Sequence, residues 1–442
     1  MSPPVRPVVN DVVLPRQAEV VVIGGGISGV AGAWELARRG TRVALVEKGV
    51  IGAEQSSRNW GWCRQQNRDE RELPLAMLAL RMWETLAEEA GGDLGFRRSG
   101  LIYTSDSDDD LAAWEAWGVM ARGYGVDTRM LGGAEAAALL PGHARRWKGG
   151  VHSPTDGRAE PGLAAPVLAE AARRAGATLH QGCAAREIEF TAGRVSGVLT
   201  EAGRIGCDTV LVAGGAWAGM LLRHHGVPFL QASIQSTSFS TEAGPEVLSA
   251  GHSTPDLTLR RRVDGGYTVG LSGFGTLHLA PRGILQTRPF WPTFLKRRAK
   301  LSFCFGKSFF LGPDSLQRWS ADGPSPFERI RVLDPAPDAQ LLRRGLEGMA
   351  EAYPALAGLR IAHAWGGMVD CTPDAIPVIG PVLSRPGLHI SAGHTGHGFG
   401  IGPAAGRLAA ELIRGETPSV DPRPFRYERM IDGTDLGSMG MM

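Results

Sequence analysis

The feature that most constrains the fold is a glycine turn between an apolar strand and an amphipathic helix. Residues 19–23 read EVVVI, a short β-branched run typical of a strand buried on both faces. Gly24, Gly26 and Gly29 follow in G-x-G-x-x-G spacing, and apolar residues recur at helical spacing over residues 27–39. A second strand, RVALVE, is predicted next. Together these elements predict a βαβ unit of the Rossmann type.

This turn predicts a binding site for the pyrophosphate of a dinucleotide. Gly24 permits the tight turn, Gly26 lets the backbone approach the phosphates, and Gly29 lets the helix pack on the strand. The helix begins at Ile27 and Ser28, where its dipole favours negative charge. We therefore predict these five residues at the cofactor.

The end of the second strand supplies a carboxylate for a ribose. Glu47 follows Gly29 by 18 residues, close to the spacing of about 20 residues at which Rossmann units place an acid. Its carboxylate would accept hydrogen bonds from ribose hydroxyls and repel a 2′-phosphate. We predict Glu47 and the adjacent Lys48 as cofactor-binding residues. These signals indicate a dinucleotide but do not distinguish FAD from NAD.

Length and composition predict a globular protein of more than one domain. The chain has 442 residues, of which 43% are hydrophobic and 21% charged. A formal net charge of +2 argues against a global attraction to nucleic acid. The five cysteines show neither CxxC nor metal-ligand spacing, so we expect reduced thiols and no metal site. We find no signal peptide or long apolar run, and expect a cytoplasmic protein.

The α/β pattern recurs in three separated parts of the chain. Between them lie segments with alternating short strands and little α/β rhythm. We therefore predict an α/β fold in which a discontinuous Rossmann-type domain carries a substrate domain with a mixed, mainly antiparallel sheet. The predicted bounds are 17–90, 155–226 and 357–430 for the nucleotide domain, 91–154 and 227–356 for the substrate domain, and 1–16 and 431–442 for the tails.

Three further blocks of sequence resemble the D-amino-acid oxidase superfamily of flavoproteins. The first is the polar segment 52–64, GAEQSSRNWGWCR, and the second is 210–219, VLVAGGAWAG. The third joins 365–380, WGGMVDCTPDAIPVIG, to 393–402, GHTGHGFGIG. The wording of the third block is most similar to the branch of the sarcosine oxidase β-subunit, dimethylglycine dehydrogenase and D-amino-acid dehydrogenases.

The resemblance implies FAD as the cofactor. In relatives, backbone amides at the start of the last helix face the flavin C2 carbonyl, where a helix dipole stabilises negative charge. Monomeric sarcosine oxidases attach FAD to a cysteine that aligns with Gly367, so we expect non-covalent FAD here, with Cys371 as a small core residue. The further cofactor residues that the resemblance implies are Ser56, Ser57, Arg58, Asn59, Gly61, Ala185, Ala213, Gly214, Trp217, Gly396, Gly398, Phe399, Gly400 and Ile401.

The resemblance also implies oxidation of a C–N bond. In this family, hydride passes from the substrate α-carbon to flavin N5 and gives an imine that water hydrolyses. We expect an amino acid or a secondary or N-substituted amino acid as substrate, with oxygen, a quinone or an electron-transfer protein as acceptor. Two alternatives stay open: a 2-hydroxy-acid or glycerol-3-phosphate-type dehydrogenase, and the flavin subunit of a heteromeric oxidase.

A substrate carboxylate needs a cation, and the candidates are arginines. Where glycine oxidase-like members place this arginine, the chain has Val369, which moves weight toward N-substituted amino acids. Arg64, just past the flavin segment, is our first choice. Residues 260–262, three consecutive arginines, are the second. His394 and His397, in the last glycine turn, are candidates to accept the amine proton or to orient the carboxylate.

Residues 281–310 have an unusual composition, with seven basic residues, seven aromatic residues and no Asp or Glu. We favour an amphipathic surface helix with buried aromatics. A peripheral membrane or quinone-docking surface, a lid over the substrate pocket and a contact with an acidic partner subunit stay open. The rest of the sequence does not support nucleic-acid binding.

Overall fold

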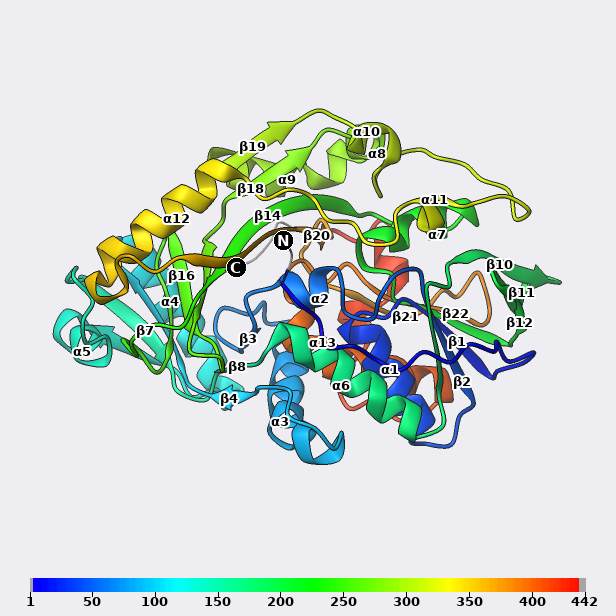
Figure 1. Ribbon diagram of the computed structural model, residues 1–442, viewed down its shortest axis with the longest axis horizontal. Coiled ribbons are helices and arrows are strands. Elements are labelled where there is room, and N and C mark those ends of the chain that lie inside the picture. The colour runs from blue at the N-terminus through cyan, green and yellow to red at the C-terminus, as the bar shows by residue number, and fades with distance from the viewer. Residues whose placement is uncertain (1–2, 437–442) are drawn as a thin grey trace.

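The computed structural model describes residues 3–436 and is organised around two large sheets (Figure 1). The first has six strands in the order β21-β22-β13-β1-β2-β9, parallel except for the antiparallel pair of β21 and β22. Its strands come from three separated parts of the chain, as the predicted Rossmann fold requires. They are β1 (Val20–Ile23), β2 (Val43–Glu47), β9 (Thr178–Gln181), β13 (Thr209–Val212), β21 (Val378–Pro381) and β22 (Leu388–Ala392).

Both faces of this sheet are buried, which explains the continuous apolar run of β1. Val20 and Val22 pack into a core formed with helices α1 (Ile27–Ala37), α3 (Leu73–Glu89), α6 (Pro161–Arg174) and α13 (Gly398–Arg414). Val21 and Ile23 face the other way. There they meet α7 (Ala218–His224) and a sheet of β10 (Ala185–Thr191), β11 (Arg194–Thr200) and β12 (Gly203–Gly206). A strand covered on both sides needs no polar face.

Helix α13 starts at Gly398, so Phe399, Gly400 and Ile401 lie in its first turn, and it passes through Pro403. Glycine and proline disfavour helix formation in isolation, so packing compensates. A Cβ atom on Gly406 would lie 2.5 Å from the Cβ of Ala31, which shows how closely α13 approaches α1.

The second sheet is mixed and mainly antiparallel, as predicted. Its order is β19-β18-β14-β17-β16-β15-β5-β7-β6, and only the pairs β18–β19 and β15–β5 are parallel. Its strands are β5 (Leu101–Ser105), β6 (Arg129–Gly132), β7 (Gly149–Ser153), β14 (Ala232–Thr241), β15 (Gly251–Ser253), β16 (Leu257–Arg261), β17 (Tyr267–Leu271), β18 (Gly275–His278), β19 (Leu301–Cys304) and β20 (Ile361–Cys371).

One predicted domain boundary needs correction. We assigned residues 357–430 to the nucleotide domain, but β20 pairs with β14 along its whole length, from Ala232 opposite Cys371 to Thr241 opposite Ile361. After the substrate domain, the chain therefore returns to the parallel sheet only at β21. No local signal separates these two strands, because the pairing of β20 joins residues more than 100 positions apart. The other domain bounds remain a proposal.

The remaining elements connect and cover the two sheets. β3 (Trp62–Cys63), β8 (Gly157–Arg158) and β4 (Arg97–Arg98) form a small sheet between them. The other helices are α2 (Gln55–Arg58), α4 (Asp108–Gly123), α5 (Gly133–Leu139), α8 (Pro281–Leu285), α9 (Thr287–Arg297), α10 (Ser308–Leu311), α11 (Pro326–Arg329) and α12 (Ala339–Ala352). Within residues 3–436, no helix is both long and apolar enough to cross a membrane.

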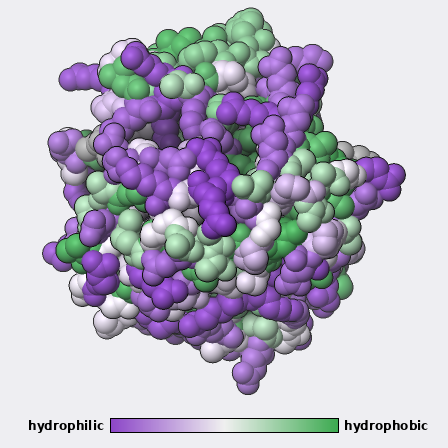
Figure 2. Space-filling view, turned by 90° about the vertical axis from the view of Figure 1, so that its left-hand side faces the viewer, coloured by the Kyte–Doolittle hydropathy of each residue, from purple (hydrophilic) through white to green (hydrophobic). Residues whose placement is uncertain are grey.

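Residues 281–310 lie on the outside of the second sheet, at the top of Figure 1. The prediction that their aromatic side chains are buried is wrong, because no residue of α9 is buried and Phe303, Phe305 and Phe310 are each more than half exposed. The segment does not fold back far enough on the sheet to cover its own apolar side chains. Figure 2 shows apolar residues gathered along this upper edge of the molecule.

Candidate functional site

A pocket of about 880 Å³, counting its open mouth, lies at the carboxyl ends of β1, β2 and β13. In α/β sheets this edge is where cofactors bind. The structure brings nine of the predicted cofactor residues together around it. These are Gly24, Gly26, Glu47, Lys48, Ser56, Ala185, Ala213, Gly214 and Trp217.

The phosphate turn has the close contacts that its glycines predict. Gly24 adopts φ +113°, and a Cβ atom there would lie 2.5 Å from the carbonyl oxygen of Ala213. A Cβ on Gly29 would lie 2.1 Å from the carbonyl oxygen of Gly24, so α1 packs directly on the turn. Gly26, the N-cap of α1, has no side chain to cap the helix. The first turn of α1 thus offers backbone N–H groups and a positive dipole to an anion.

Two hydrogen bonds of serine side chains hold this helix in place. Ser56 accepts a hydrogen bond from the amide of Ile27 at 2.8 Å, which ties the segment after β2 to the start of α1. The hydroxyls of Ser28 and Ser391 lie 2.6 Å apart in the core and join α1 to β22. Ser28 is therefore buried in a helix-to-strand contact, while Ser56 lines the pocket itself.

Glu47 and Lys48 form the wall of the pocket beside the turn. The Glu47 carboxylate accepts hydrogen bonds from the amides of Gly25 and Gly49, both at 2.7 Å, and burial raises its pKa. Lys48 Nζ lies 2.5 Å from Glu54 Oε1 and 4.6 Å from the centre of the Trp217 ring. The carboxylate is thus fixed at the position expected for a ribose.

The polar segment after β2 is fixed by its own side chains. Asn59 donates to the carbonyl oxygens of Gln55 and Ser56 at 3.1 and 2.8 Å, and accepts from the amide of Gly61 at 2.7 Å. Ser57 donates to the carbonyl of Glu54 at 3.2 Å. These residues, predicted at the cofactor, shape the loop around α2 and do not line the pocket.

Arg58 also points away from the pocket. Its buried guanidinium donates to the carbonyl of Leu333 and pairs with Asp334 at 3.2 Å. Burial lowers its pKa, although Asp334 opposes that effect. Arg58 therefore fastens the segment around residue 333 beside the cofactor segment.

The last glycine turn leads into α13. Phe399 is buried 5.3 Å from the Trp83 ring, and Trp83 donates its indole N–H to the carbonyl of Gly400 at 2.8 Å. His397, the N-cap of α13, makes no side-chain capping bond. The first backbone N–H groups of α13 are therefore not capped by the His397 side chain. They lie at the positive end of the helix dipole, which a flavin C2 carbonyl would need. The other predicted residues of this turn, Gly396, Gly398 and Ile401, lie in the same turn or the first helical turn.

Gly367 stands where monomeric sarcosine oxidases place a flavin-linking cysteine. A Cβ atom there would lie 2.3 Å from Gln55 Oε1, so no larger side chain fits without displacing Gln55. Cys371 is buried, and burial strongly raises the pKa of its thiol. All five cysteines are free.

The predicted catalytic residues surround a buried carboxylate that the sequence analysis missed. His397 Nδ1 lies 2.9 Å from Glu72 Oε2, and both side chains are buried. Burial and the charge of Arg68 lower the pKa of His397 to about 4. Arg64, half-buried, lies close enough to lower the His397 pKa further. Arg64 makes no ion pair within the described part of the chain, and its guanidinium donates to the carbonyl of Gln66 at 2.5 Å.

His394 lies two residues before Gly396 and is buried as well. Burial lowers its pKa, and its Nε2 atom has no hydrogen-bond partner among the described residues. Val369 contacts the turn at 3.6 Å from a Cβ built on Gly396. His394 and Val369 therefore both border the glycine turn that precedes α13.

The second choice for a carboxylate partner is occupied by acids of the protein. Arg260 is buried 2.8 Å from Glu160, Arg261 pairs with Glu246 at 3.4 Å, and Arg262 pairs with Glu160 at 3.7 Å. A substrate would have to displace these partners. The geometry favours Arg64.

Several residues that line the pocket were not predicted. Glu54 and Gln55 lie inside the polar segment 52–64, and their carboxylate and amide were the available signal. Phe327, Arg331 and Met368 come from distant parts of the chain. Met368 lies in the block 365–380, but no local motif marks Phe327 or Arg331, which only the fold brings to the pocket.

Comparisons with known proteins agree with this architecture. A family model described as DAO, FAD dependent oxidoreductase, matches residues 19–412. Glycine oxidase of Geobacillus kaustophilus is 28% identical over 93% of this chain and 97% of its own. Sarcosine oxidase subunit beta of Rhizobium meliloti is 25% identical over 96% and 90%. The structure of L-amino acid deaminase from Proteus myxofaciens, in complex with anthranilate, matches with a TM-score of 0.91, at 28% identity over 97% and 96%.

The parallel sheet, the phosphate turn and the overlying mixed sheet define an α/β enzyme that uses a dinucleotide. The chain belongs to the DAO family of FAD dependent oxidoreductases, since the family model spans most of its length. This confirms the predicted family, the fold class and FAD as the cofactor. When bound, FAD supplies the hydride acceptor. The residues named above remain predictions as its ligands.

Proposed function

We propose that this protein oxidises the C–N bond of an amino acid, releasing an imine that water hydrolyses to an oxo acid and an amine or ammonia. The observation that carries the proposal is that Arg64, which makes no ion pair within residues 3–436, lies near enough to lower the pKa of His397, the residue just before α13. Arg64 would bind the substrate carboxylate, and the histidine would face its amine.

The comparisons support an amino acid over a hydroxy acid. The relatives reported above are named for glycine, sarcosine and L-amino acids, and the Proteus structure holds anthranilate, which carries both an amino and a carboxylate group. The likeness to L-amino acid deaminase favours a substrate with a primary amine. Val369, at the position of the glycine oxidase arginine, favours an N-substituted amino acid. The two substrate classes make different products.

The test is anaerobic reduction of the bound flavin by a panel of L-, D- and N-alkyl amino acids and 2-hydroxy acids. We expect an amino acid to bleach the flavin, with one equivalent of ammonia or alkylamine per equivalent of oxo acid. Bleaching by a 2-hydroxy acid alone would contradict the proposal. A flavin that no compound bleaches until a second protein is added would favour the subunit alternative, which the β-subunit likeness motivates.

We propose that FAD is held without a covalent bond. The packing of Gln55 against Gly367 supports this, because it leaves no room for a linking cysteine at that position. Acid precipitation should release all flavin into the supernatant and leave a colourless pellet. A yellow pellet with an FAD-sized mass increase on a peptide would contradict it.

We further propose that residues 281–310 dock the enzyme on an anionic membrane, where a quinone or electron-transfer protein would accept the electrons. Exposed apolar side chains next to basic residues are features of peripheral membrane surfaces. Arg282 and Lys300 of this segment pair with Asp314 and Asp256, which lie outside it. This basic aromatic surface includes the exposed apolar residues Ile284, Leu285, Trp291, Leu295, Phe303, Phe305 and Phe310. An acidic partner subunit that covers this surface is the alternative, and binding to anionic vesicles distinguishes the two.

A further inference from the structure

The contact between His397 and Glu72 fixes the orientation of the imidazole. Nδ1 of His397 lies 2.9 and 3.3 Å from the two carboxylate oxygens of Glu72, so Nδ1–H donates to the carboxylate. Nε2 must then carry the lone pair. It is buried and has no partner in the described part of the chain. A buried acceptor without a donor is costly, which indicates that a ligand supplies the donor.

We propose that Glu72 is a positioning residue that holds His397 in this tautomer, so that Nε2 accepts a proton from the ammonium group of the amino-acid substrate. The inference rests on the proposed function. Amino acids enter as ammonium ions, and only the free amine can release hydride from the α-carbon. One proton passes from the ammonium nitrogen to Nε2, the N–H bond breaks, and the electron pair stays on the substrate nitrogen. FAD, when bound, would supply the acceptor for the α-hydrogen as hydride.

The charges around the pair act on His397 in opposite directions: burial and Arg68 lower its pKa to about 4, whereas the Glu72 carboxylate raises it. Burial alone would raise the pKa of Glu72, but His397 and Arg68 together lower it to about 2. Glu72 thus stays ionised and can stabilise an imidazolium when the proton arrives. The titratable and charged groups that face the pair are Arg64, Arg68 and Arg71 from the segment before α3, and His394 from the glycine turn. Asp370 of β20 interacts with His394 and not with the pair itself.

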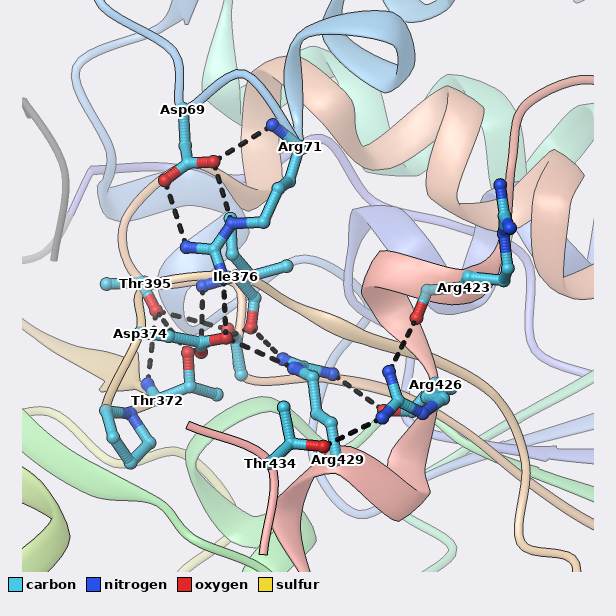
Figure 3. A network of polar contacts seen from close by, with 12 residues as sticks. Asp69, Arg71, Thr372, Asp374, Ile376, Thr395, Arg423, Arg426, Arg429 and Thr434 are labelled. Atoms are coloured by element: carbon cyan, nitrogen blue, oxygen red, sulfur yellow. Dashed lines mark hydrogen bonds and ion pairs between the residues drawn. The ribbon is translucent and has the colours of Figure 1, made fainter. Parts of the chain in front are cut away.

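A polar network involves residues close to Glu72 and His397 in the sequence, namely Arg71 and Thr395 (Figure 3). Arg71, next to Glu72, binds Asp69 at 2.9 Å and lies 3.6 Å from Asp374. Asp374 in turn pairs with Arg429 at 3.2 Å. This network joins the start of α3, the loop after β20 and the C-terminal segment.

The same loop contacts the turn that carries His397. Thr395 accepts a hydrogen bond from the amide of Thr372 at 3.1 Å. Thr395 and Ala375 have positive φ, as does Asn67 in the segment before Glu72. Of the four non-glycine residues with positive φ between residues 3 and 436, three therefore lie in segments that hold this pair. Such strain concentrates where geometry serves function.

The first measurement does not depend on turnover. Long-range ¹H–¹⁵N spectra of protein labelled at histidine report which ring nitrogen carries hydrogen. His397 is assigned as the signal lost in H397N. We expect a neutral Nδ1–H tautomer in the wild-type holoenzyme and loss of this fixed tautomer in E72Q. An Nε2–H tautomer in the wild type would overturn the proposal, and this readout holds even if E72Q does not fold.

The second measurement is the pH dependence of anaerobic flavin reduction. At pH 7 we expect H397N and E72Q to slow reduction by on the order of 10²-fold. Their rates should recover about tenfold per pH unit toward the amine pKa, because the substrate then enters already deprotonated. E70Q is the matched control: Glu70 is exposed, bonds Tyr124, and should stay within about twofold of the wild type.

A purely structural role predicts a different result. The same factor of loss at every pH in E72Q, with lowered flavin content, would overturn the proposal. Failure of the proposed function would instead show as wild-type flavin that no amino acid reduces. The tautomer measured by NMR would then test the hydrogen bond between His397 and Glu72 independently of turnover.

Discussion

Trp83 donates its indole N–H to the carbonyl oxygen of Gly400 at 2.8 Å, although 317 positions separate the two residues. The bond joins the middle of α3 to the first turn of α13 in the core. It uses a carbonyl near the helix N-terminus, in the turn that carries the predicted cofactor residues Phe399, Gly400 and Ile401. If that prediction holds, one side chain joins the packing of the core to cofactor binding.

Replacing Trp83 with phenylalanine should lower both the stability of the fold and the affinity for FAD. W83F leaves the buried Gly400 carbonyl short of one donor, and we expect the free energy of unfolding to fall by about 1–3 kcal/mol. Denaturant unfolding followed by circular dichroism measures this, and flavin fluorescence measures FAD release. W114F is the control, because Trp114 is buried against Tyr103 and its indole N–H makes no hydrogen bond within residues 3–436. Equal losses in both variants would contradict the explanation.

Adding one methyl group at Gly29 should abolish cofactor binding. The Cβ of G29A would lie 2.1 Å from the carbonyl oxygen of Gly24, so the phosphate turn must move. We expect the purified variant to contain less than about a tenth of the wild-type flavin, read from the ratio of visible to ultraviolet absorbance. G123A, at the end of α4, meets no atom within 4 Å and should bind FAD normally. Normal flavin content in G29A would refute the packing argument.

The phosphate unit could be predicted because its signals are contiguous. The apolar strand, the glycines and Glu47 all lie within 30 residues, and burial on both faces of β1 leaves its mark as an unbroken apolar run. The first turn of α13 could not be predicted by periodicity, since its glycines and Pro403 are weak helix formers that rely on contact with α1.

The missing site residue shows the limit of sequence patterns. Glu72 reads as one more acid in the run RDERE, typical of a solvated helix start. Only its burial against His397, 325 positions away, shows its role. The prediction for the aromatic side chains of residues 281–310 erred in the opposite direction, since they are exposed and not buried. An amphipathic composition does not reveal whether another molecule covers the apolar face.

The basic aromatic surface should bind anionic vesicles. We expect the protein to sediment with vesicles that contain phosphatidylglycerol, less with neutral ones, and less at high salt. The triple variant F303S/F305S/F310S removes three exposed apolar side chains and should weaken binding by at least about tenfold.

L383S is the matched control for this surface. Leu383 is 69% exposed but lies outside residues 281–310, so its replacement should leave vesicle binding unchanged. Equal binding by the triple variant and the wild type would contradict membrane docking. A loss of association with a co-purifying acidic protein, with vesicle binding unaffected, would favour the subunit alternative.

His225 should make the fold sensitive to mild acid. Its Nε2 accepts a hydrogen bond from the amide of Ile188 at 3.0 Å, which only the neutral ring can do. Burial lowers its pKa to about 4, with a smaller contribution from His224. The unfolded chain, with an ordinary histidine pKa near 6.5, therefore binds more protons between about pH 4 and 6.5. Stability is fully present above this window and falls as the pH drops through it, by up to about 1.4 kcal/mol per pH unit from this residue.

Denaturant unfolding at several pH values measures that slope. In H225Q the glutamine carbonyl can accept from Ile188 without titrating, so we expect the free energy of unfolding to depend less steeply on pH between 4 and 6.5. His252 titrates in the same direction and remains in both proteins, since burial lowers its pKa to about 3. The difference between the two slopes therefore isolates His225, and identical slopes would show that its ring is not held neutral by the Ile188 amide.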